Sequence, residues 1–186
     1  MSDQTTGNVT IAFLGVGEMG TPMASRLISA GFGVRVWNRS TERLKALVQL
    51  GATEASTPGR AVSGADVVIT MLPDGPVTQS VATGPDGVLA NLTSGQIWLQ
   101  MGTIGLEWAE RLGKSATDKG AIFVDSPVSG SVGPATSGQL VILASGPDEA
   151  QAVANPIFAA LGSHTFWLGA AGAGSRAKLV LNNWLV

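Results

Sequence analysis

The sequence contains no cysteine and only one histidine, His164. The lack of cysteine excludes disulfides, thiolate metal sites and cysteine nucleophiles. One histidine cannot form a metal site by itself, so we expect no metal. His164 stands between a glycine and an apolar run, and we expect it in a loop or at the edge of a strand rather than in catalysis.

Charge is also scarce, because only 13% of the 186 residues are charged and the formal net charge is −2. There is no basic cluster to neutralise a nucleic acid or hold an anionic membrane surface, so we expect neither partner. Residues 1–8 are polar and lack the order of a signal peptide, and no apolar run reaches the roughly 18 residues of a membrane span. The sequence therefore predicts a globular cytoplasmic protein.

Apolar, β-branched runs alternate with segments of helical periodicity. This alternation is typical of βαβ units and predicts an α/β fold with a Rossmann-like, doubly wound, mostly parallel sheet. The expected strands are 9–15, 33–38, 66–72, 95–101, 121–126, 139–145 and 164–169. The expected helices are 18–31, 41–49, 104–119 and 147–161.

The last part of the chain, residues 171–186, differs from the rest. A helix is expected from Ser175 to Val186, with Ala177, Leu181, Trp184 and Leu185 on one stripe and Leu179 and Val186 pointing elsewhere. A helix that is apolar on more than one face needs a second partner surface. We therefore divide the chain into a Rossmann domain, 1–170, and the start of a long interdomain helix, 171–186.

Three glycines, Gly15, Gly17 and Gly20, form G-x-G-x-x-G between the first expected strand and the first expected helix. In this context the pattern indicates a dinucleotide-binding turn. Gly15 allows the tight turn, Gly17 lets a pyrophosphate approach the backbone, and Gly20 lets helix and strand pack closely. Met19, inside the motif, is included among the expected cofactor-binding residues.

The second expected strand ends at Asn38-Arg39-Ser40. A domain specific for NAD usually has an acidic residue here for the ribose 2′-hydroxyl, and this chain has none. Arg39 can instead make a forked, charge-assisted contact to a 2′-phosphate, with Asn38 and Ser40 as neutral donors nearby. The sequence thus predicts that NADP(H) is preferred over NAD(H).

The chain resembles the β-hydroxyacid dehydrogenases, which include 3-hydroxyisobutyrate dehydrogenase and the glyoxylate/succinic semialdehyde reductases. The resemblance rests on the glycine turn, Asn38-Arg39, Met71-Leu72-Pro73, the segment 125–140 and the segment 172–183. It implies an oxidoreductase that moves hydride between NADP(H) and a small carboxylate carrying a β-hydroxyl or semialdehyde group.

The resemblance also implies roles for single residues in the middle of the chain. Leu72 and Pro73 match the family's cofactor-contacting pair, and Thr103 matches a threonine that touches cofactor and substrate. The family usually has serine where this chain has Gly102. Ser129 and Gly130 match the substrate-carboxylate site, and a hydroxyl beside consecutive N–H groups suits an anion.

Lys178 and Asn182 match the family's catalytic pair. They are four residues apart and so share one helical face. A lysine can donate a proton to a carbonyl that becomes an alkoxide, and in the oxidative direction it must first be neutral, which requires a lowered pKa. Asn182 would orient the substrate oxygen and the amine.

Two other functions remain open. Imine reductases resemble this family in fold and cofactor turn but generally lack the lysine found at Lys178, and some relatives are non-catalytic binding modules. The family also implies an all-helical domain after the long helix, which closes the substrate cleft and makes a dimer. We expect that domain to be absent from this chain, and a homo-dimer or higher homo-oligomer to form.

Overall fold

The computed structural model describes residues 9–184. Its centre is a parallel six-stranded sheet in the order β3-β2-β1-β4-β5-β6. The strands are β1 (Thr10–Leu14), β2 (Gly33–Trp37), β3 (Thr53–Glu54), β4 (Val67–Thr70), β5 (Ile97–Gln100) and β6 (Ile122–Asp125). The order reverses between β1 and β4, and ligands of open α/β sheets bind beyond the carboxyl ends of the strands at such a point.

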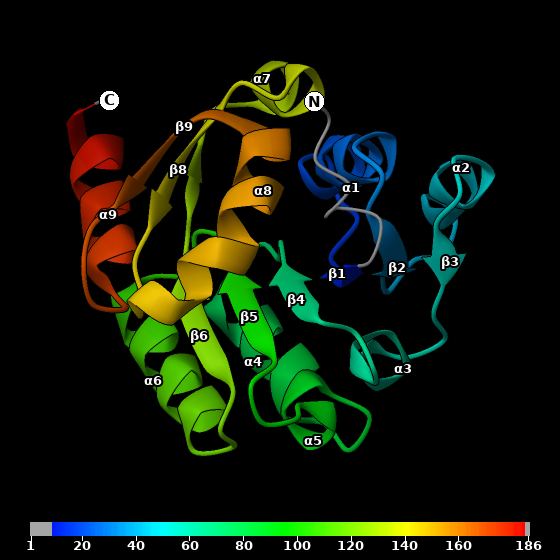
Figure 1. Ribbon diagram of the computed structural model, residues 1–186, viewed down its shortest axis with the longest axis horizontal. Helices are drawn as coiled ribbons and strands as arrows, with labels where there is room; N and C mark the ends of the chain where they lie inside the picture. The colour runs from blue at the N-terminus through cyan, green and yellow to red at the C-terminus, as the bar shows by residue number, and fades with distance from the viewer. Residues whose placement is uncertain (1–8, 185–186) are drawn as a thin grey trace.

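Helices cover both faces of this sheet (Figure 1), which confirms the predicted Rossmann-like fold. Along β1, Ile11 and Phe13 pack on one face while Ala12 and Leu14 pack on the other. All four are fully buried, and burial on both faces explains why the strands are continuous apolar runs.

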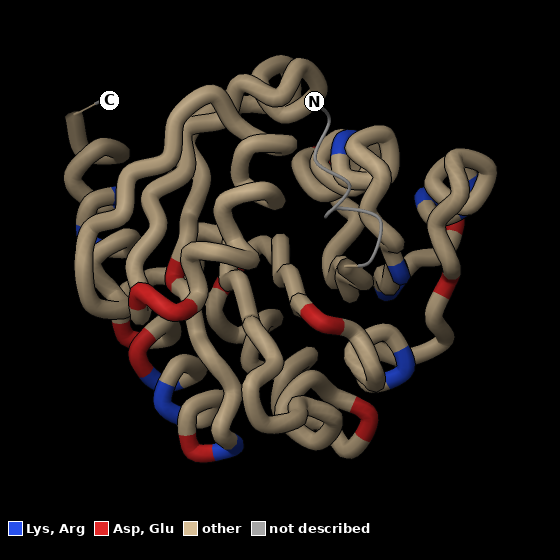
Figure 2. Tube along the Cα trace, in the orientation of Figure 1, with Lys and Arg blue, Asp and Glu red and all other residues tan. Residues whose placement is uncertain are grey.

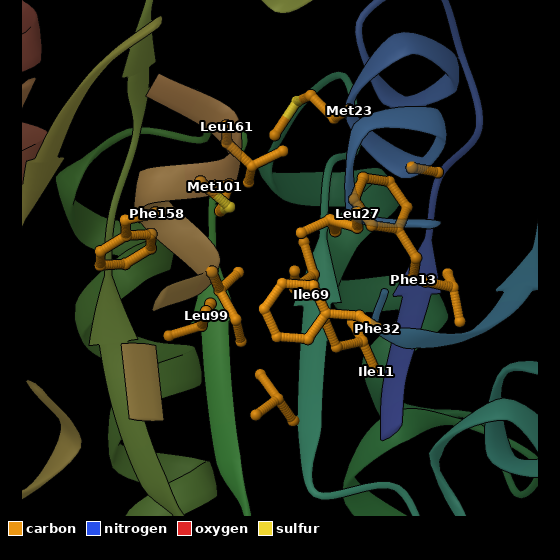
Figure 3. Packing of buried hydrophobic residues seen from close by; sticks show 14 of the residues in the cluster. Ile11, Phe13, Met23, Leu27, Phe32, Ile69, Leu99, Met101, Phe158 and Leu161 are labelled. Carbon is orange, nitrogen blue, oxygen red and sulfur yellow. The ribbon is translucent and has the colours of Figure 1, made fainter. Parts of the chain in front are cut away.

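The first face is covered by α1 (Gly20–Ser29), α2 (Leu44–Gln49) and α8 (Gln151–Leu161), the last preceded by a 3-10 turn, η2 (Asp148–Ala150). Figure 3 shows Leu27 of α1 close to Phe13 and Ile69, while Phe158 and Leu161 of α8 lie nearer β5. The second face is covered by α3 (Pro58–Val62), α4 (Gly75–Thr83), α5 (Val88–Asn91) and α6 (Leu106–Thr117).

A second, smaller sheet corrects the expectation of one sheet. Expected strands 139–145 and 164–169 correspond to β8 (Leu140–Ala144) and β9 (Gly162–Trp167), which pair with β7 (Val128–Ser129) in the order β7-β8-β9. Between β7 and β8 there is room only for the short helix α7 (Val132–Ser137), whereas a parallel crossover needs a dozen or more residues. The chain therefore turns back, and β8 runs antiparallel to β7.

The last helix, α9 (Ala173–Trp184), packs against α6, β6 and β8. Four of its apolar side chains are exposed, by 44% at Leu179, 60% at Val180, 37% at Leu181 and 87% at Trp184. The prediction of more than one exposed apolar face is confirmed for these residues, while Leu185 and Val186 lie outside the described part. Residues 179–184 of this helix include no charged side chain, and in Figure 2 the end of the tube near the C-terminus is tan.

Two smaller predictions can also be compared with the fold. His164 is exposed on β9, which is an edge strand of the small sheet, as expected. Among residues 9–184 no helix is long and apolar enough to cross a membrane, and residues 1–8 lie outside the described part.

Candidate functional site

The three glycines form a tight turn between β1 and α1. Gly15 has φ of 103° and its N–H donates to Trp37 O at 3.0 Å. A side chain at Gly15 would collide with Met71 O, and one at Gly20 would collide with Gly15 O. Glycine is therefore required at both positions by the close approach of backbone to backbone.

Gly17 has a different environment, because a Cβ atom built there would meet nothing within 4 Å. Within the described residues the N–H groups of Gly17, Glu18 and Met19 donate no hydrogen bond, and they precede the ten-residue helix α1. Free N–H groups at a helix N-terminus favour an anion. The turn thus offers an open cradle for a pyrophosphate.

Asn38 ties this turn to the end of β2. Its Oδ1 accepts from Val16 N at 3.0 Å, and its Nδ2 donates to Ser40 O at 2.8 Å. The side chain predicted as a neutral donor to a ligand therefore also fixes the spacing between the glycine turn and Arg39. The sequence did not indicate that second role.

A cleft of about 790 Å³ opens beside the turn. Its wall contains six of the residues predicted to bind cofactor, Gly17, Asn38, Arg39, Ser40, Leu72 and Pro73, together with Val16 from within the glycine motif. Segments between Val77 and Gly87 form the opposite wall. The structure therefore brings the predicted cofactor residues of β1, β2 and β4 together in one place.

Charge in the cleft is balanced, because Arg39 and Arg43 face it together with Glu42 and Asp86. Within the described part of the chain, the Arg39 guanidinium makes no hydrogen bond or ion pair. It is exposed and available to a ligand. A 2′-phosphate would gain from direct contact with a guanidinium rather than from a net positive field. Glu42 and Arg43 were not predicted from the sequence, because they lie in the turn between β2 and α2 and no motif marks them.

Thr103 is exposed just beyond β5, and a buried glutamine holds the backbone before it. Gln100 Nε2 donates to Gly102 O at 2.7 Å, and its Oε1 accepts from Gly102 N at 3.1 Å. A Cβ at Gly102 would approach Leu72 O to 2.6 Å, so the backbone here leaves room only for glycine. The loop bearing Thr103 therefore packs directly on the loop bearing Leu72.

Ser129 and Gly130 lie outside the cleft, at the end of β7 and immediately after it. Ser129 is half-buried, and Gly130 is exposed with φ of 134°. The start of this segment touches α9, since a Cβ at Gly174 would lie 3.1 Å from Pro127 Cδ.

Lys178 and Asn182 stand on α9, also outside the cleft. Lys178 is half-buried, and burial lowers the pKa of its amine below the usual 10.5. Asn182 is exposed. The contact between Pro127 and Gly174 places the start of α9 beside the segment that leads to Ser129.

The comparisons with known proteins agree with this fold. A family model described as the NAD binding domain of 6-phosphogluconate dehydrogenase matches residues 10–169. Glyoxylate/succinic semialdehyde reductase 2 of Arabidopsis thaliana is 39% identical over 176 residues, covering 95% of this chain and 49% of that protein. For 3-hydroxyisobutyrate dehydrogenase of Pseudomonas aeruginosa the identity is 40%, covering 95% and 59%.

Solved structures of similar fold come from the same group of enzymes and from an imine reductase. Mycobacterium tuberculosis 3-hydroxyisobutyrate dehydrogenase, solved with L-serine, has a TM-score of 0.90 and 33% identity, covering 95% of this chain and 60% of that one. An imine reductase from Pseudomonas sp. has a TM-score of 0.84 and 29% identity, covering 95% and 61%. The chain thus spans between about half and three fifths of the length of these proteins.

Proposed function

We propose, starting from the fact that this chain belongs to the β-hydroxyacid dehydrogenase family, that it is the cofactor-binding part of an NADP(H)-dependent oxidoreductase acting on a small β-hydroxyacid or semialdehyde. The observation that carries the proposal is the coexistence of an open phosphate cradle at Gly17 with a half-buried lysine of lowered pKa on α9. The division into a domain over 1–170 and a helix from 171 stays a prediction.

The residues of the cleft fit a dinucleotide. The N–H groups of Gly17 and Met19 would hold the pyrophosphate, Arg39 and Ser40 the 2′-phosphate, and Leu72-Pro73 would form an apolar wall. A bound nicotinamide cofactor would supply the hydride in one direction and the hydride acceptor in the other. Thr103, on the loop packed against Leu72, would stand between cofactor and substrate.

The residues that would bind the substrate and transfer its proton are Ser129, Gly130, Lys178 and Asn182. The Ser129 hydroxyl and the N–H groups of its turn would bind the carboxylate. In reduction the Lys178 ammonium would give its proton to the oxygen that gains negative charge, and in oxidation the neutral amine would take that proton back. The lowered pKa of Lys178 supports both steps, since it makes the neutral amine easier to reach. Asn182 would orient the oxygen.

One assay separates this function from its rival. The protein as its gene encodes it is mixed with NADPH and, in parallel, with glyoxylate, succinic semialdehyde and a cyclic imine. We expect NADPH oxidation with the carbonyl acids. Oxidation with the imine alone would favour imine reductase, which the likeness to the Pseudomonas sp. enzyme keeps as the second candidate. Binding of NADPH with no turnover of any substrate would favour a non-catalytic module.

Cofactor preference is the first prediction. NADPH should bind at least about tenfold more tightly than NADH, because a forked contact from Arg39 to the 2′-phosphate contributes about 1.4 kcal/mol or more. Fluorescence titration of both cofactors measures it. Arg39→Ala should abolish the preference, while Arg111→Ala, an exposed arginine on α6, should retain it. Equal affinities in the parent protein would overturn the assignment of Arg39.

Association through α9 is the second prediction. Val180 and Trp184 are exposed, and covering such a side chain stabilises by about 1.5–3 kcal/mol. We therefore expect the 186-residue chain to form dimers or larger species in light scattering. Val180→Ser should weaken the association, whereas Val48→Ser, a comparably exposed valine on α2, should not. A monodisperse monomer at every concentration would contradict the prediction.

A further inference from the structure

The first turn of α9 is held by three buried polar side chains, Asp125, Ser145 and Ser175, named here the Asp125 cluster. Asp125 Oδ2 accepts from Ser175 N at 2.7 Å, and Oδ1 accepts from Ser175 Oγ at 2.8 Å. Ser145 Oγ accepts from Gly174 N at 2.9 Å. The exposed fractions are 0%, 0% and 4%, so these bonds are shielded from water.

The same cluster joins the two sheets. Asp125, the last residue of β6, and Ser145, which follows β8, exchange backbone hydrogen bonds of 2.9 and 2.8 Å. Ser145 Oγ also donates toward Asp125 O at 3.1 Å. A Cβ at Gly174 would collide with Leu143 O and lie 2.8 Å from Asp125 O, so α9 begins in direct contact with both strands.

Burial raises the pKa of the Asp125 carboxyl, and the hydrogen bonds from Ser175 act in the opposite direction. Within residues 9–184, Asp125 has no ion-pair partner. A buried carboxyl without a cation is costly for folding. Its cost is offset in part by the N–H groups and the dipole at the start of α9, which favour a negative charge there.

The position of the cluster relates it to Lys178. Ser175 and Lys178 are three residues apart, which places them on neighbouring positions of one helix face. Asp125 also begins the segment that leads through Pro127 to Ser129 and Gly130. Asp125 therefore links the two parts of the predicted site: its carboxylate bonds to the helix that carries the amine, and its backbone continues into the segment that leads to the predicted carboxylate site.

We propose that Asp125 is a positioning residue, which fixes the first turn of α9 on the end of β6 and so sets the Lys178 amine relative to the Ser129–Gly130 loop. The inference rests on the proposed function, because it concerns the same reaction. The exposed Arg176–Glu110 ion pair, at 3.2 Å, also links α9 to α6, but exposed pairs contribute little to geometry or stability.

Two variants of different severity test the proposal in the protein as its gene encodes it. Ser175→Ala removes one hydroxyl donor, and Asp125→Asn removes the negative charge and leaves one accepting oxygen where the carboxylate offers two. We expect kcat to fall about tenfold for Ser175→Ala and about 100-fold for Asp125→Asn, since a displacement of about 1 Å can have such an effect. NADPH affinity should be unchanged, because the cleft lies at the ends of β1, β2 and β4, and β5 separates β4 from β6.

The decisive readout is a double-mutant cycle with Lys178→Ala. If the cluster acts through the amine, Ser175→Ala should lower kcat in the parent protein but have no further effect in the Lys178→Ala background. Equal losses in both backgrounds would mean a merely structural role and would overturn the proposal. Should Asp125→Asn fail to fold, Ser175→Ala still decides, because it leaves the carboxylate and one hydrogen bond in place.

Matched controls are Ser115→Ala, a helical serine on α6, and Glu110→Gln, which removes only the exposed ion pair to α9. Both should leave kcat unchanged. The failures of the two proposals are distinguishable. If Lys178→Ala itself retains full turnover, the proposed function is wrong. If Lys178→Ala is inactive while Ser175→Ala and a folded Asp125→Asn turn over normally, only the positioning role is wrong.

Discussion

Replacing Lys178 by alanine should lower kcat by about 100-fold or more while NADPH affinity changes little. Loss of a positioned acid/base group has an effect of this size. The amine is the titratable group on α9 whose burial depresses its pKa, and it lies outside the cleft that would hold the dinucleotide. Steady-state kinetics in both directions and a cofactor titration measure the two quantities.

The role of Lys178 also predicts the direction in which each rate changes with pH. Oxidation needs the neutral amine, so its rate should rise with pH and level off above a pKa that lies below 10.5. Reduction needs the ammonium and should fall through the same pKa. Lys119→Ala, an exposed lysine after α6, is the control and should match the parent protein. Near-normal turnover of Lys178→Ala would remove lysine from the chemistry and favour an imine reductase or a binding module.

The main sheet could be predicted from the sequence because its strands are buried on both faces. Runs such as Val67–Thr70 are fully buried and apolar apart from one threonine, and each is bounded by a turn signal. The segments α3, α5 and α7 have four to six residues, which is too short for a helical period to be recognised. Thr57 caps α3 through Arg60 N, a local signal that could have been found.

The separate small sheet could not be predicted from strand patterns alone. Strand β8 is as apolar as the strands of the main sheet, and sheet membership depends on which partner the chain can reach. Here the short connection through α7 and the paired backbones of Asp125 and Ser145 decide it. Those are long-range constraints, which periodicity does not record.

In the candidate site, too, some residues could be predicted from the sequence and others could not. Gly15, Gly17 and Gly20 were recognisable because their spacing is dictated by local backbone geometry. The roles of Asn38 and Gln100 as supports of loops, and of Asp125 as a cap for α9, depend on contacts between segments distant in sequence. Polar residues at strand ends are common, and only the fold shows which backbone groups they hold.

Gly17→Ala should weaken NADPH binding by about 100-fold without destabilising the fold. The added methyl meets no protein atom within 4 Å, so the change acts on the space in front of the turn. If the pyrophosphate lies there, the methyl overlaps it and weakens charge-assisted hydrogen bonds of about 1.5–3 kcal/mol each, and about 2.7 kcal/mol corresponds to 100-fold. Fluorescence titration and thermal unfolding measure the two effects.

The chain offers a matched control in Gly133→Ala, at an exposed position of α7 where an added methyl also meets nothing within 4 Å. Both variants add a methyl group to open space, so both should unfold at nearly the temperature at which the parent protein unfolds. A lower NADPH affinity in Gly17→Ala alone would therefore show that the ligand binds at Gly17. Full NADPH affinity in Gly17→Ala would show that the pyrophosphate does not bind at this turn. The proposed contacts of Arg39 and Leu72 with the cofactor in the same cleft would then also be wrong.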